Sequence, residues 1–159
     1  MRLITAIILL VISSSAFCEI ADRVVVSKSN KMLYLHKEGK VFASYPVAFG
    51  SVPAGHKEKE GDGRTPEGIY TIDFKKENSA YYKALHVSYP NLKDIEQAKI
   101  SGVSSGGDIM IHGQKNGFGW AAFIVQRFNW TKGCVALANE NMEQVWQSVN
   151  EGTAIEIQP

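Results

Sequence analysis

The sequence predicts a mainly β fold with a few helices, in the α+β class. Its apolar residues come in short runs rich in β-branched and aromatic side chains, and turn-forming residues separate these runs. Only residues 140–149 show a strong helical spacing of apolar side chains. The chain has 159 residues, of which 45% are hydrophobic, so it is long enough for one domain with its own buried core.

Residues 1–18 have the pattern of a secretory signal peptide. Arg2 provides a positive start, an apolar run covers residues 3–12 with a single interruption, and small residues follow. This run is shorter than the about 20 apolar residues that span a membrane. We therefore expect no stable membrane span, and an exported protein of the periplasm or cell envelope whose domain is residues 19–159.

Charge and cysteine content narrow the function further. Lipoproteins have a small residue directly before the lipidated cysteine. Phe17 occupies this position before Cys18, which disfavours lipidation of Cys18. The 17 Lys and Arg residues nearly balance the 16 Asp and Glu residues, and this balance argues against a nucleic-acid partner. If Cys18 leaves with the signal peptide, Cys134 is a lone thiol in an oxidising compartment.

The first part of the domain is predicted to be a β-meander. Strands are expected at residues 24–26, 32–35 and 41–49, where the apolar runs lie. Turn-forming residues at 29–30 and 38–40 separate these strands.

The middle of the chain is predicted to alternate loops and strands with one short helix. Residues 61–68 are turn formers that predict a long ordered loop leading into a strand at 69–74. The glycines of this loop do not have the spacing of a phosphate-binding loop. A strand is expected at 83–88, followed by a short helix capped by Asn91 and a buried strand at 108–112.

Two helices and a strand are expected in the last third. Residues 121–130 have helical character, and the clearest helix covers 140–149 with Asn139 as its N-cap. A last strand follows at 153–157. The helix places four apolar residues on one face, which predicts that they lie in the core: Met142, Val145, Trp146 and Val149.

Cys134 has two interpretations, a small buried hydrophobic residue or a nucleophile. It lies in a tight loop, and Gly133 permits a close turn that directs backbone amides toward a carbonyl oxygen under attack. A thiol needs a neighbouring base to act as a nucleophile. Loops held between rigid elements are common sites for such residues.

Four histidines are candidates for that base. His112 is favoured because it ends a buried strand and precedes a glycine-rich loop. His36 is expected on the surface, and His56 lies in a charged loop. His86 lies inside a strand, where it either lines a cleft or faces solvent.

Two motifs resemble the L,D-transpeptidase (YkuD-like) catalytic domain. They are Ile109-Met110-Ile111-His112-Gly113 and Thr131-Lys132-Gly133-Cys134. Residues 61–68 and 129–136 also resemble segments of this family, and the segments occur in the family's order. The second of them resembles a subgroup that has a Trp-Thr-x-Gly-Cys motif.

The resemblance implies a compact β-sandwich with a catalytic cysteine loop that acts on peptidoglycan stem peptides. It implies that Cys134 is the nucleophile and that His112 is its base and later proton donor. The backbone amides of Gly133 and Cys134 would form the oxyanion hole, and the carbonyl of Gly113 would orient the imidazole. It implies no cofactor and no metal.

Substrate contacts are expected from His86, Trp130, Thr131 and Lys132.

The sequence departs from the family pattern at two positions. Lys132 stands where many members have a second histidine, and Ala136 stands where many have Arg or Asn. The change at Lys132 replaces a hydrogen-bond donor on a ring by a flexible cation. The change at Ala136 removes a planar group that can bind a carboxylate through two hydrogen bonds. The nature of the substrate and acceptor is therefore open.

Several functions fit these residues. The first is an exported L,D-transpeptidase. The same thiol with water as acceptor would make an L,D-carboxypeptidase, or an amidase that releases a murein-linked protein. A murein-binding module without catalysis is a further alternative. A zinc site formed by His86, His112 and Cys134 is disfavoured because the ligands lack the usual short spacing.

Overall fold

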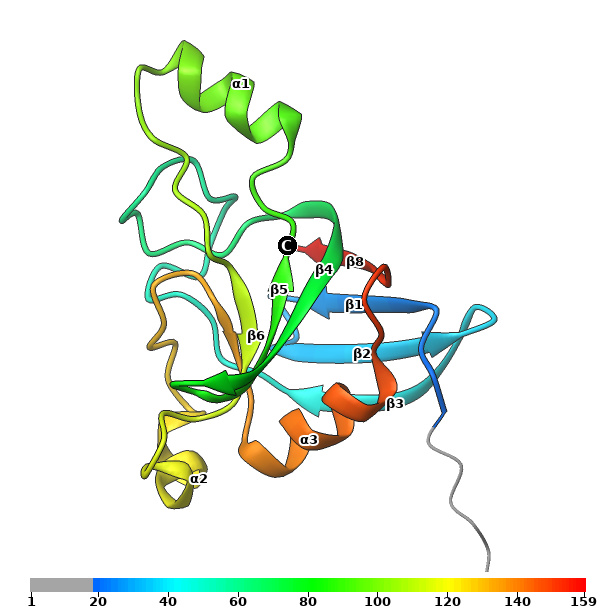
Figure 1. Ribbon diagram of the computed structural model, residues 1–159. Helices are drawn as coiled ribbons and strands as arrows, with labels where there is room; N and C mark the ends of the chain where they lie inside the picture. Colours follow the sequence, from blue (N-terminus) through cyan, green and yellow to red (C-terminus); the bar gives the residue numbers. More distant parts are fainter. Residues whose placement is uncertain (1–18) are drawn as a thin grey trace, which may run out of the picture.

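The computed structural model describes residues 19–159, so the expectations for the signal peptide and for Cys18 lie outside the described residues. Figure 1 shows strands that form the centre of the molecule, with helices at its periphery. The strands form one eight-stranded sheet with the order β3-β2-β1-β8-β4-β5-β6-β7. Their bounds are β1 Arg23–Ser27, β2 Met32–Lys37, β3 Lys40–Pro46, β4 Gly68–Ser79, β5 Tyr82–Val87, β6 Met110–His112, β7 Val135–Ala136 and β8 Ala154–Gln158.

The helices are short. They are α1 Leu92–Ile100, the 3₁₀ helix η1 Gly119–Ala121, α2 Ala122–Val125 and α3 Asn139–Ser148. The mainly β fold with a few helices is confirmed. Among residues 19–159, no helix has both the length and the apolar character needed to cross a membrane.

The long strand β4 connects the two halves of the sheet. Its start, residues 68–71, pairs with β8, whereas the part from Ile72 to Ser79 pairs with β5. Figure 1 shows that β1–β3 run across the direction of β4–β6. Strands of both halves contribute to one core, which includes Val24, Leu33, Leu35, Ile72, Leu85, Val87, Ile111, Val135, Ile155 and Ile157. The sheet thus folds over its own apolar face, because each half must cover that face.

The predicted meander is confirmed, since β1 pairs antiparallel with β2, and β2 pairs antiparallel with β3. The ordered loop before β4 is also confirmed. In it, the Asp62 carboxylate accepts hydrogen bonds from Lys57 Nζ at 2.9 Å and from the backbone amides of Glu58, Lys59 and Arg64. Asp62 therefore provides the order that the turn residues alone do not explain.

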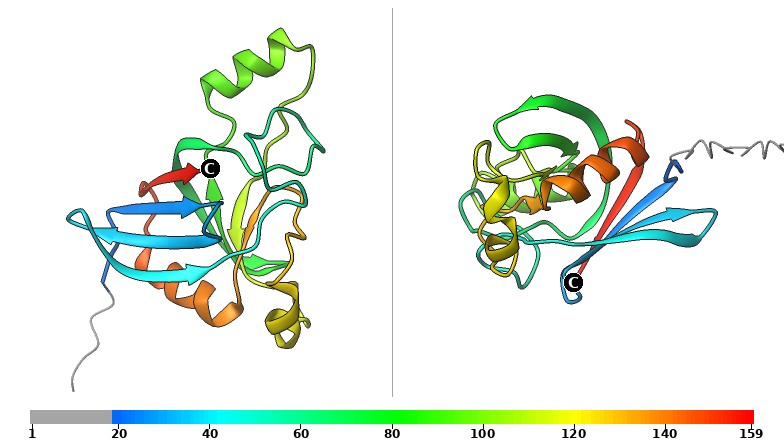
Figure 2. Two further views of the ribbon diagram at one scale, coloured as in Figure 1. Left: turned by 180° about the vertical axis from the view of Figure 1, so that it is seen from behind. Right: turned by 90° about the horizontal axis from the view of Figure 1, so that it is seen from below.

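The predicted helix after Asn91 is confirmed as α1. The Asn91 side chain accepts hydrogen bonds from the amides of Lys93 and Asp94, and the Asp94 carboxylate accepts one from the Asn91 amide. This helix projects from the rest of the molecule in Figures 1 and 2. It leaves Leu92 and Ile100 largely exposed.

Three strand bounds differ clearly from the sequence prediction. The strand predicted over 41–49 ends at Pro46 as β3, and beyond it only isolated bridges form at Ala48 and Gly50. β4 extends five residues beyond Phe74, because β5 provides a hydrogen-bonding partner for its second half. β6 begins at Met110 rather than at 108. Asp108 has a φ of 54°, a left-handed conformation that cannot continue a strand.

The helix predicted over 121–130 was wrong in its extent. Only η1 and the single turn of α2 form, and the amides of Arg127 and Phe128 then bond to carbonyls three residues earlier. The Asn129 side chain accepts a hydrogen bond from the Phe49 amide at 3.2 Å, which draws the chain away from a helical path. Phe123 and Phe128 are exposed, so no buried face supports a longer helix.

The helix predicted at 140–149 forms as α3, but its predicted cap was wrong. Ala138 holds the N-cap position without a side-chain hydrogen bond. The Asn139 side-chain oxygen Oδ1 instead accepts from the Gln114 backbone amide at 2.8 Å. Met142, Val145 and Val149 are buried as expected, whereas Trp146 is half-buried with Lys75 Nζ 4.4 Å from its ring centroid.

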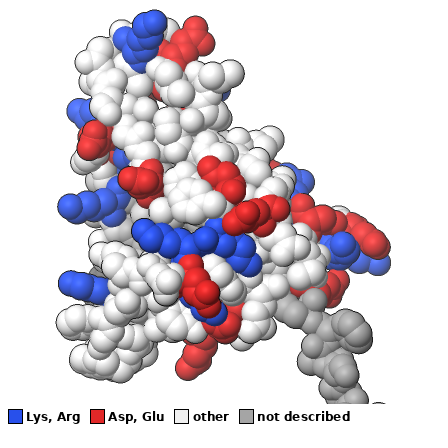
Figure 3. Space-filling model, in the orientation of Figure 1, with Lys and Arg blue, Asp and Glu red and all other residues white. Residues whose placement is uncertain are grey.

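Charges of both signs are interspersed on the face of the molecule seen in Figure 3. This agrees with the near balance of acidic and basic residues in the sequence. The face presents no broad field of a single sign to a charged polymer.

Candidate active site

The loop of residues 130–134, here called the Cys134 loop, is bound to the chain that leaves β3. The Thr131 amide donates to the Phe49 carbonyl at 3.1 Å, and the Ser51 amide donates to the Thr131 carbonyl at 3.0 Å. Ala48 and Ala136 exchange two further backbone hydrogen bonds. The loop therefore has a partner on both sides of the cysteine.

The Thr131 hydroxyl holds the loop from within. Its Oγ1 donates to the Cys134 carbonyl at 2.7 Å and accepts from the Gly133 amide at 3.1 Å. Thr131 is buried, with 6% of its surface exposed. The residue lines the cleft, but its hydroxyl is used to fix the backbone around the thiol.

Gly133 is required by its surroundings. It has a φ of 130°, and a Cβ atom at this position would lie 2.6 Å from the Arg64 carbonyl oxygen. Only glycine accepts both the conformation and the close approach. The loop before β4 thus forms the wall behind the Cys134 loop.

Strand alternation turns His112 and Cys134 to the same side of the sheet. β6 and β7 are parallel, with Ile111 opposite Val135, and both of these residues are fully buried in the core. His112 follows Ile111 and Cys134 precedes Val135, so both side chains point away from that core. They line one cleft of about 440 Å³.

The imidazole of His112 has a defined orientation. Its Nδ1 lies 2.6 Å from the Gly113 carbonyl oxygen. A carbonyl only accepts hydrogen bonds, so Nδ1 carries the hydrogen and Nε2 holds a free electron pair. The ring packs between Tyr81, at a centroid distance of 4.8 Å, and Trp130, at 5.8 Å.

Burial favours the uncharged forms of both groups. It lowers the pKa of His112, although the hydrogen bond to Gly113 opposes this shift. Burial also raises the pKa of the Cys134 thiol, and the negative charge of Asp108 adds to this effect, whereas the Met110 amide and Lys57 oppose it. Both shifts therefore favour a neutral thiol and a neutral imidazole at neutral pH.

The remaining predicted substrate contacts fall into two groups. Trp130, Thr131 and Lys132 line the cleft, and Lys132 is exposed. His86 does not line it. Its Nδ1 lies 2.6 Å from Asp73 Oδ1, and its ring stacks on Phe74 at 4.4 Å.

The other two histidines lie away from the cleft. His36 is half-buried in β2, where a surface position was expected. His56 accepts a hydrogen bond from the Glu67 amide and lies 3.2 Å from the Asp94 carboxylate, so it joins the loop before β4 to α1.

Sequence reasoning missed several residues of the cleft, among them Lys76, Tyr81 and Asp108. The Asp108 carbonyl oxygen lies 3.7 Å from Cys134 Sγ. An aspartate after two glycines is a turn signal and gives no sign of this contact. Tyr81 reaches the cleft only because β4 and β5 form a longer hairpin than predicted.

The zinc alternative is not supported by side-chain placement. Within residues 19–159, no three His, Cys, Asp or Glu side chains are placed together as metal ligands. His86 is bound to Asp73 instead of joining His112 and Cys134.

Comparison with known proteins adds three findings. Residues 21–157 match the family model of the L,D-transpeptidase catalytic domain, YkuD. The chain is 30% identical over 108 residues to "Putative L,D-transpeptidase YafK" of Escherichia coli K12, and the match covers 67% of this chain and 36% of that protein. The chain therefore spans about a third of the length of this relative.

Solved structures show the same fold. The helical cell shape determining protein Pgp2 of Campylobacter jejuni superposes with a TM-score of 0.64 and 28% identity, over 85% of this chain and 46% of Pgp2. Bd1075 of Bdellovibrio bacteriovorus superposes with a TM-score of 0.60 and 22% identity, over 91% of this chain and 49% of Bd1075. The likeness to Bd1075 concerns the fold alone.

Proposed function

The chain belongs to the L,D-transpeptidase catalytic domain family, and from this premise we propose that it transfers acyl groups of peptidoglycan stem peptides through a Cys134 thioester. The observation that carries the proposal is the shared cleft of Cys134 and His112, with His112 Nδ1 bound to the Gly113 carbonyl. Because Nδ1 donates its hydrogen to the Gly113 carbonyl, Nε2 is the ring atom that can accept the proton of the thiol.

The proposed reaction begins with proton transfer from Cys134 Sγ to His112 Nε2. The sulfur attacks the carbonyl carbon at the L-centre of a diamino acid, and its electron pair forms the C–S bond. The Cys134 amide is the proposed donor to the resulting oxyanion, because the Gly133 amide already donates to Thr131. His112 then protonates the departing amine of the terminal D-amino acid, and a thioester is left.

The second half of the reaction reverses these roles. An acceptor amine attacks the thioester, His112 takes its proton, and the sulfur leaves and is reprotonated. Water in place of the amine gives hydrolysis, as in a carboxypeptidase or an amidase that releases a murein-linked protein. The sequence departs from the family pattern at Lys132 and Ala136, so hydrolysis must be tested beside transfer. Ala136 is fully buried and offers no group that binds a carboxylate.

Two lysines support a substrate that carries carboxylates. Lys76, Lys132 and Asp108 all line the cleft. A stem peptide with a terminal carboxylate and a free amine matches this mixture of charges. We propose that export, predicted from residues 1–18, brings the chain to this substrate, and that its likeness to Pgp2 extends to a role in cell shape.

Intact-mass spectrometry tests the proposal. The chain without residues 1–18 is incubated with muropeptides and, separately, with a carbapenem. We expect an adduct on the wild type and on a His36→Gln control, no adduct on Cys134→Ala, and a greatly slowed adduct on His112→Gln. Released products then distinguish transfer from hydrolysis.

Two outcomes would overturn this proposal. One is an adduct that persists on Cys134→Ala. The other is a wild type with a reduced thiol that binds muropeptides but forms no adduct and releases no product, as a non-catalytic binding module would.

A further inference from the structure

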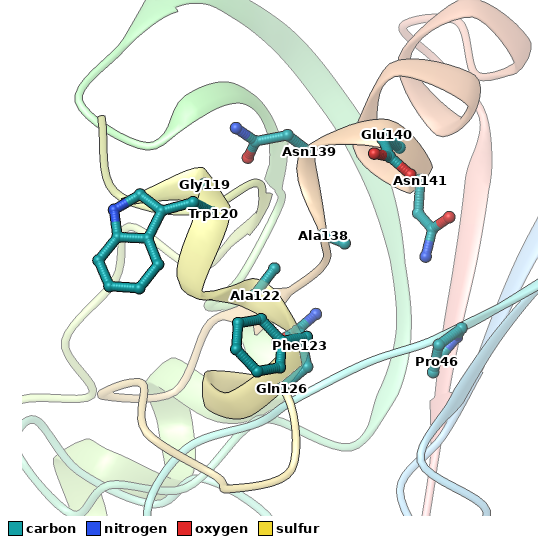
Figure 4. Close-up of a pocket in the computed structure, with 10 residues that line it drawn as sticks. All are labelled: Pro46, Gly119, Trp120, Ala122, Phe123, Gln126, Ala138, Asn139, Glu140 and Asn141. Atoms are coloured by element: carbon teal, nitrogen blue, oxygen red, sulfur yellow. The ribbon is translucent and has the colours of Figure 1, made fainter. Parts of the chain in front are cut away.

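A second cavity, of about 620 Å³, is not used by the proposed reaction. It lies between η1–α2 and the start of α3, and Figure 4 shows the side chains that surround it. Residues 114–129 are here called the aromatic segment. The segment begins directly after Gly113 and ends directly before Trp130. This segment therefore borders the second cavity while its two ends adjoin the cleft that contains Cys134.

One wall of the cavity is aromatic. Trp120 and Phe123 both line it, although 73% and 67% of their surfaces are exposed. Figure 4 shows the Trp120 ring projecting from η1 and the Phe123 ring projecting from α2. Large rings in this position offer flat apolar faces to a ligand.

The opposite wall supplies hydrogen-bond donors. α3 begins at this wall, and none of the described side chains caps its first amides, because Ala138 has no polar group and the Asn139 oxygen is bound to the Gln114 amide. Figure 4 shows the Asn141 amide group on this side of the cavity. The Glu140 carboxylate, next to it, disfavours an anionic ligand.

One buried acceptor at the cavity has no donor among residues 19–159. Gln126 lines the cavity, and its Nε2 donates to the Ala136 carbonyl at 2.9 Å. Its Oε1 is buried and has no hydrogen-bond partner among residues 19–159. A ligand N–H or O–H that reaches this oxygen would supply the missing hydrogen bond.

We propose that this cavity binds an acetamido sugar of the glycan strand that carries the stem peptides. The C–H face of the sugar ring stacks on Trp120, and the acetamido methyl group packs on Phe123. The acetamido carbonyl accepts from the α3 amides, and a sugar N–H or O–H donates to Gln126 Oε1. This inference rests on the proposed function, since the stem peptides are linked to chains of acetamido sugars.

The polar lining distinguishes this ligand from a lipid surface. A site for an anionic membrane presents basic side chains beside its apolar residues, whereas this cavity is lined by one carboxylate and three amide side chains, Gln126, Asn139, Glu140 and Asn141. A neutral ligand with both donors and acceptors matches these groups.

Titration calorimetry with tri-N-acetylchitotriose tests the inference. This probe carries no peptide, so its binding is measured independently of the thiol. We expect the wild type to bind it, and Trp120→Ala to lose about tenfold or more in affinity. Phe128→Ala is the matched control, because Phe128 is an exposed aromatic residue of the same segment that does not line the cavity. Cellotriose, which lacks the acetamido groups, is expected to bind at least about tenfold more weakly.

Three results would overturn the saccharide site: no binding of chitotriose, equal losses in Trp120→Ala and Phe128→Ala, or Trp120-dependent binding to phosphatidylglycerol vesicles in its place. None of these results alters the adduct on Cys134. Conversely, an absent adduct together with Trp120-dependent saccharide binding refutes only the proposed reaction.

Discussion

The Cys134 loop and the aromatic segment are neighbours in the chain, yet they use their side chains in opposite ways. The loop buries Thr131, uses its hydroxyl twice and presses Gly133 against the Arg64 carbonyl. The aromatic segment instead exposes five large apolar residues: Phe118, Trp120, Phe123, Ile124 and Phe128.

The difference reflects what each region must hold in place. A nucleophile acts only within a narrow range of positions, so the surrounding backbone is fixed by several independent contacts. The aromatic segment is held by the side chains of Gln114, Gln126 and Asn129, which bond to the Leu137 carbonyl, the Ala136 carbonyl and the Phe49 amide. Between these anchors, its rings are available to a ligand.

The largest expected effect comes from a glycine-to-alanine substitution in the Cys134 loop, and the same substitution in the aromatic segment serves for comparison. Gly133→Ala is expected to slow adduct formation at Cys134 by more than about 100-fold and to destabilise the fold by at least about 2 kcal/mol, because the new Cβ meets the Arg64 carbonyl at 2.6 Å. Gly117→Ala is the matched change in the aromatic segment. Its φ is 83° and nothing lies within 4 Å of the added Cβ, so a cost of about 1 kcal/mol is expected. Urea unfolding and intact-mass time courses measure both, and equal costs would refute the contrast.

The next effect isolates the Thr131 hydroxyl. Thr131→Val removes the hydrogen bonds to the Cys134 carbonyl and the Gly133 amide while it keeps the side-chain volume. We expect the rate of adduct formation to fall by about tenfold or more, since buried backbone groups lose their partner. Thr131→Ser keeps the hydroxyl and is expected to restore most of the rate. A Thr131→Ser variant as slow as Thr131→Val would show that the methyl group matters instead.

A third prediction concerns the loop behind the Cys134 loop. Burial alone would raise the pKa of Asp62, but the hydrogen bonds from Lys57 and three backbone amides lower it to about 2. A carboxyl whose pKa is lower in the folded state stabilises the fold above its unfolded pKa of about 3.9, and this stability is lost as the pH falls toward the folded value. Asp62→Asn is therefore expected to cost about 2 kcal/mol at pH 7.

The cost should shrink toward zero as the pH approaches 2. Urea unfolding at neutral and acidic pH measures it. Glu58→Gln is the control, because its ion pair with Arg64 is exposed and contributes less than about 0.5 kcal/mol. A loss in Asp62→Asn that does not depend on pH would contradict the assignment.

The smallest effect concerns the protonation state of the site. Burial raises the pKa of Cys134 and lowers that of His112. We therefore expect the thiol to be neutral at pH 7, without thiolate absorbance, and to ionise only above the ordinary thiol pKa of about 8.5. The adduct rate is expected to rise through a pKa below about 6.5, where the imidazole becomes neutral. Thiolate absorbance in the ultraviolet, with Cys134→Ala as the blank, measures the first pKa.

Asp108→Asn sharpens this test, since removal of the negative charge is expected to lower the thiol pKa. Strong thiolate absorbance at pH 7 in the wild type would indicate a preformed thiolate–imidazolium pair, contrary to this prediction.

Local sequence patterns determined much of the fold. The β-meander, the ordered loop before β4, the capped helix α1 and the apolar face of α3 all follow from residues within a few positions of one another. Steric limits at turns, strand alternation and helix capping act over these short ranges, so the sequence displays them directly. The motifs around His112 and Cys134 likewise indicated the family without any knowledge of the fold.

Tertiary contacts decided the rest. Residues 121–130 carry helical spacing, but the bond from the Phe49 amide to Asn129 and the absence of a covering layer in residues 19–159 limit α2 to one turn. Asn139 has the residue type of a helix cap, yet it binds the Gln114 amide from a distant loop. The Tyr81 and Trp130 rings that confine His112 come from two loops far apart in the chain. Such contacts depend on which segments the bent sheet brings together, and neighbouring residues carry no record of that choice.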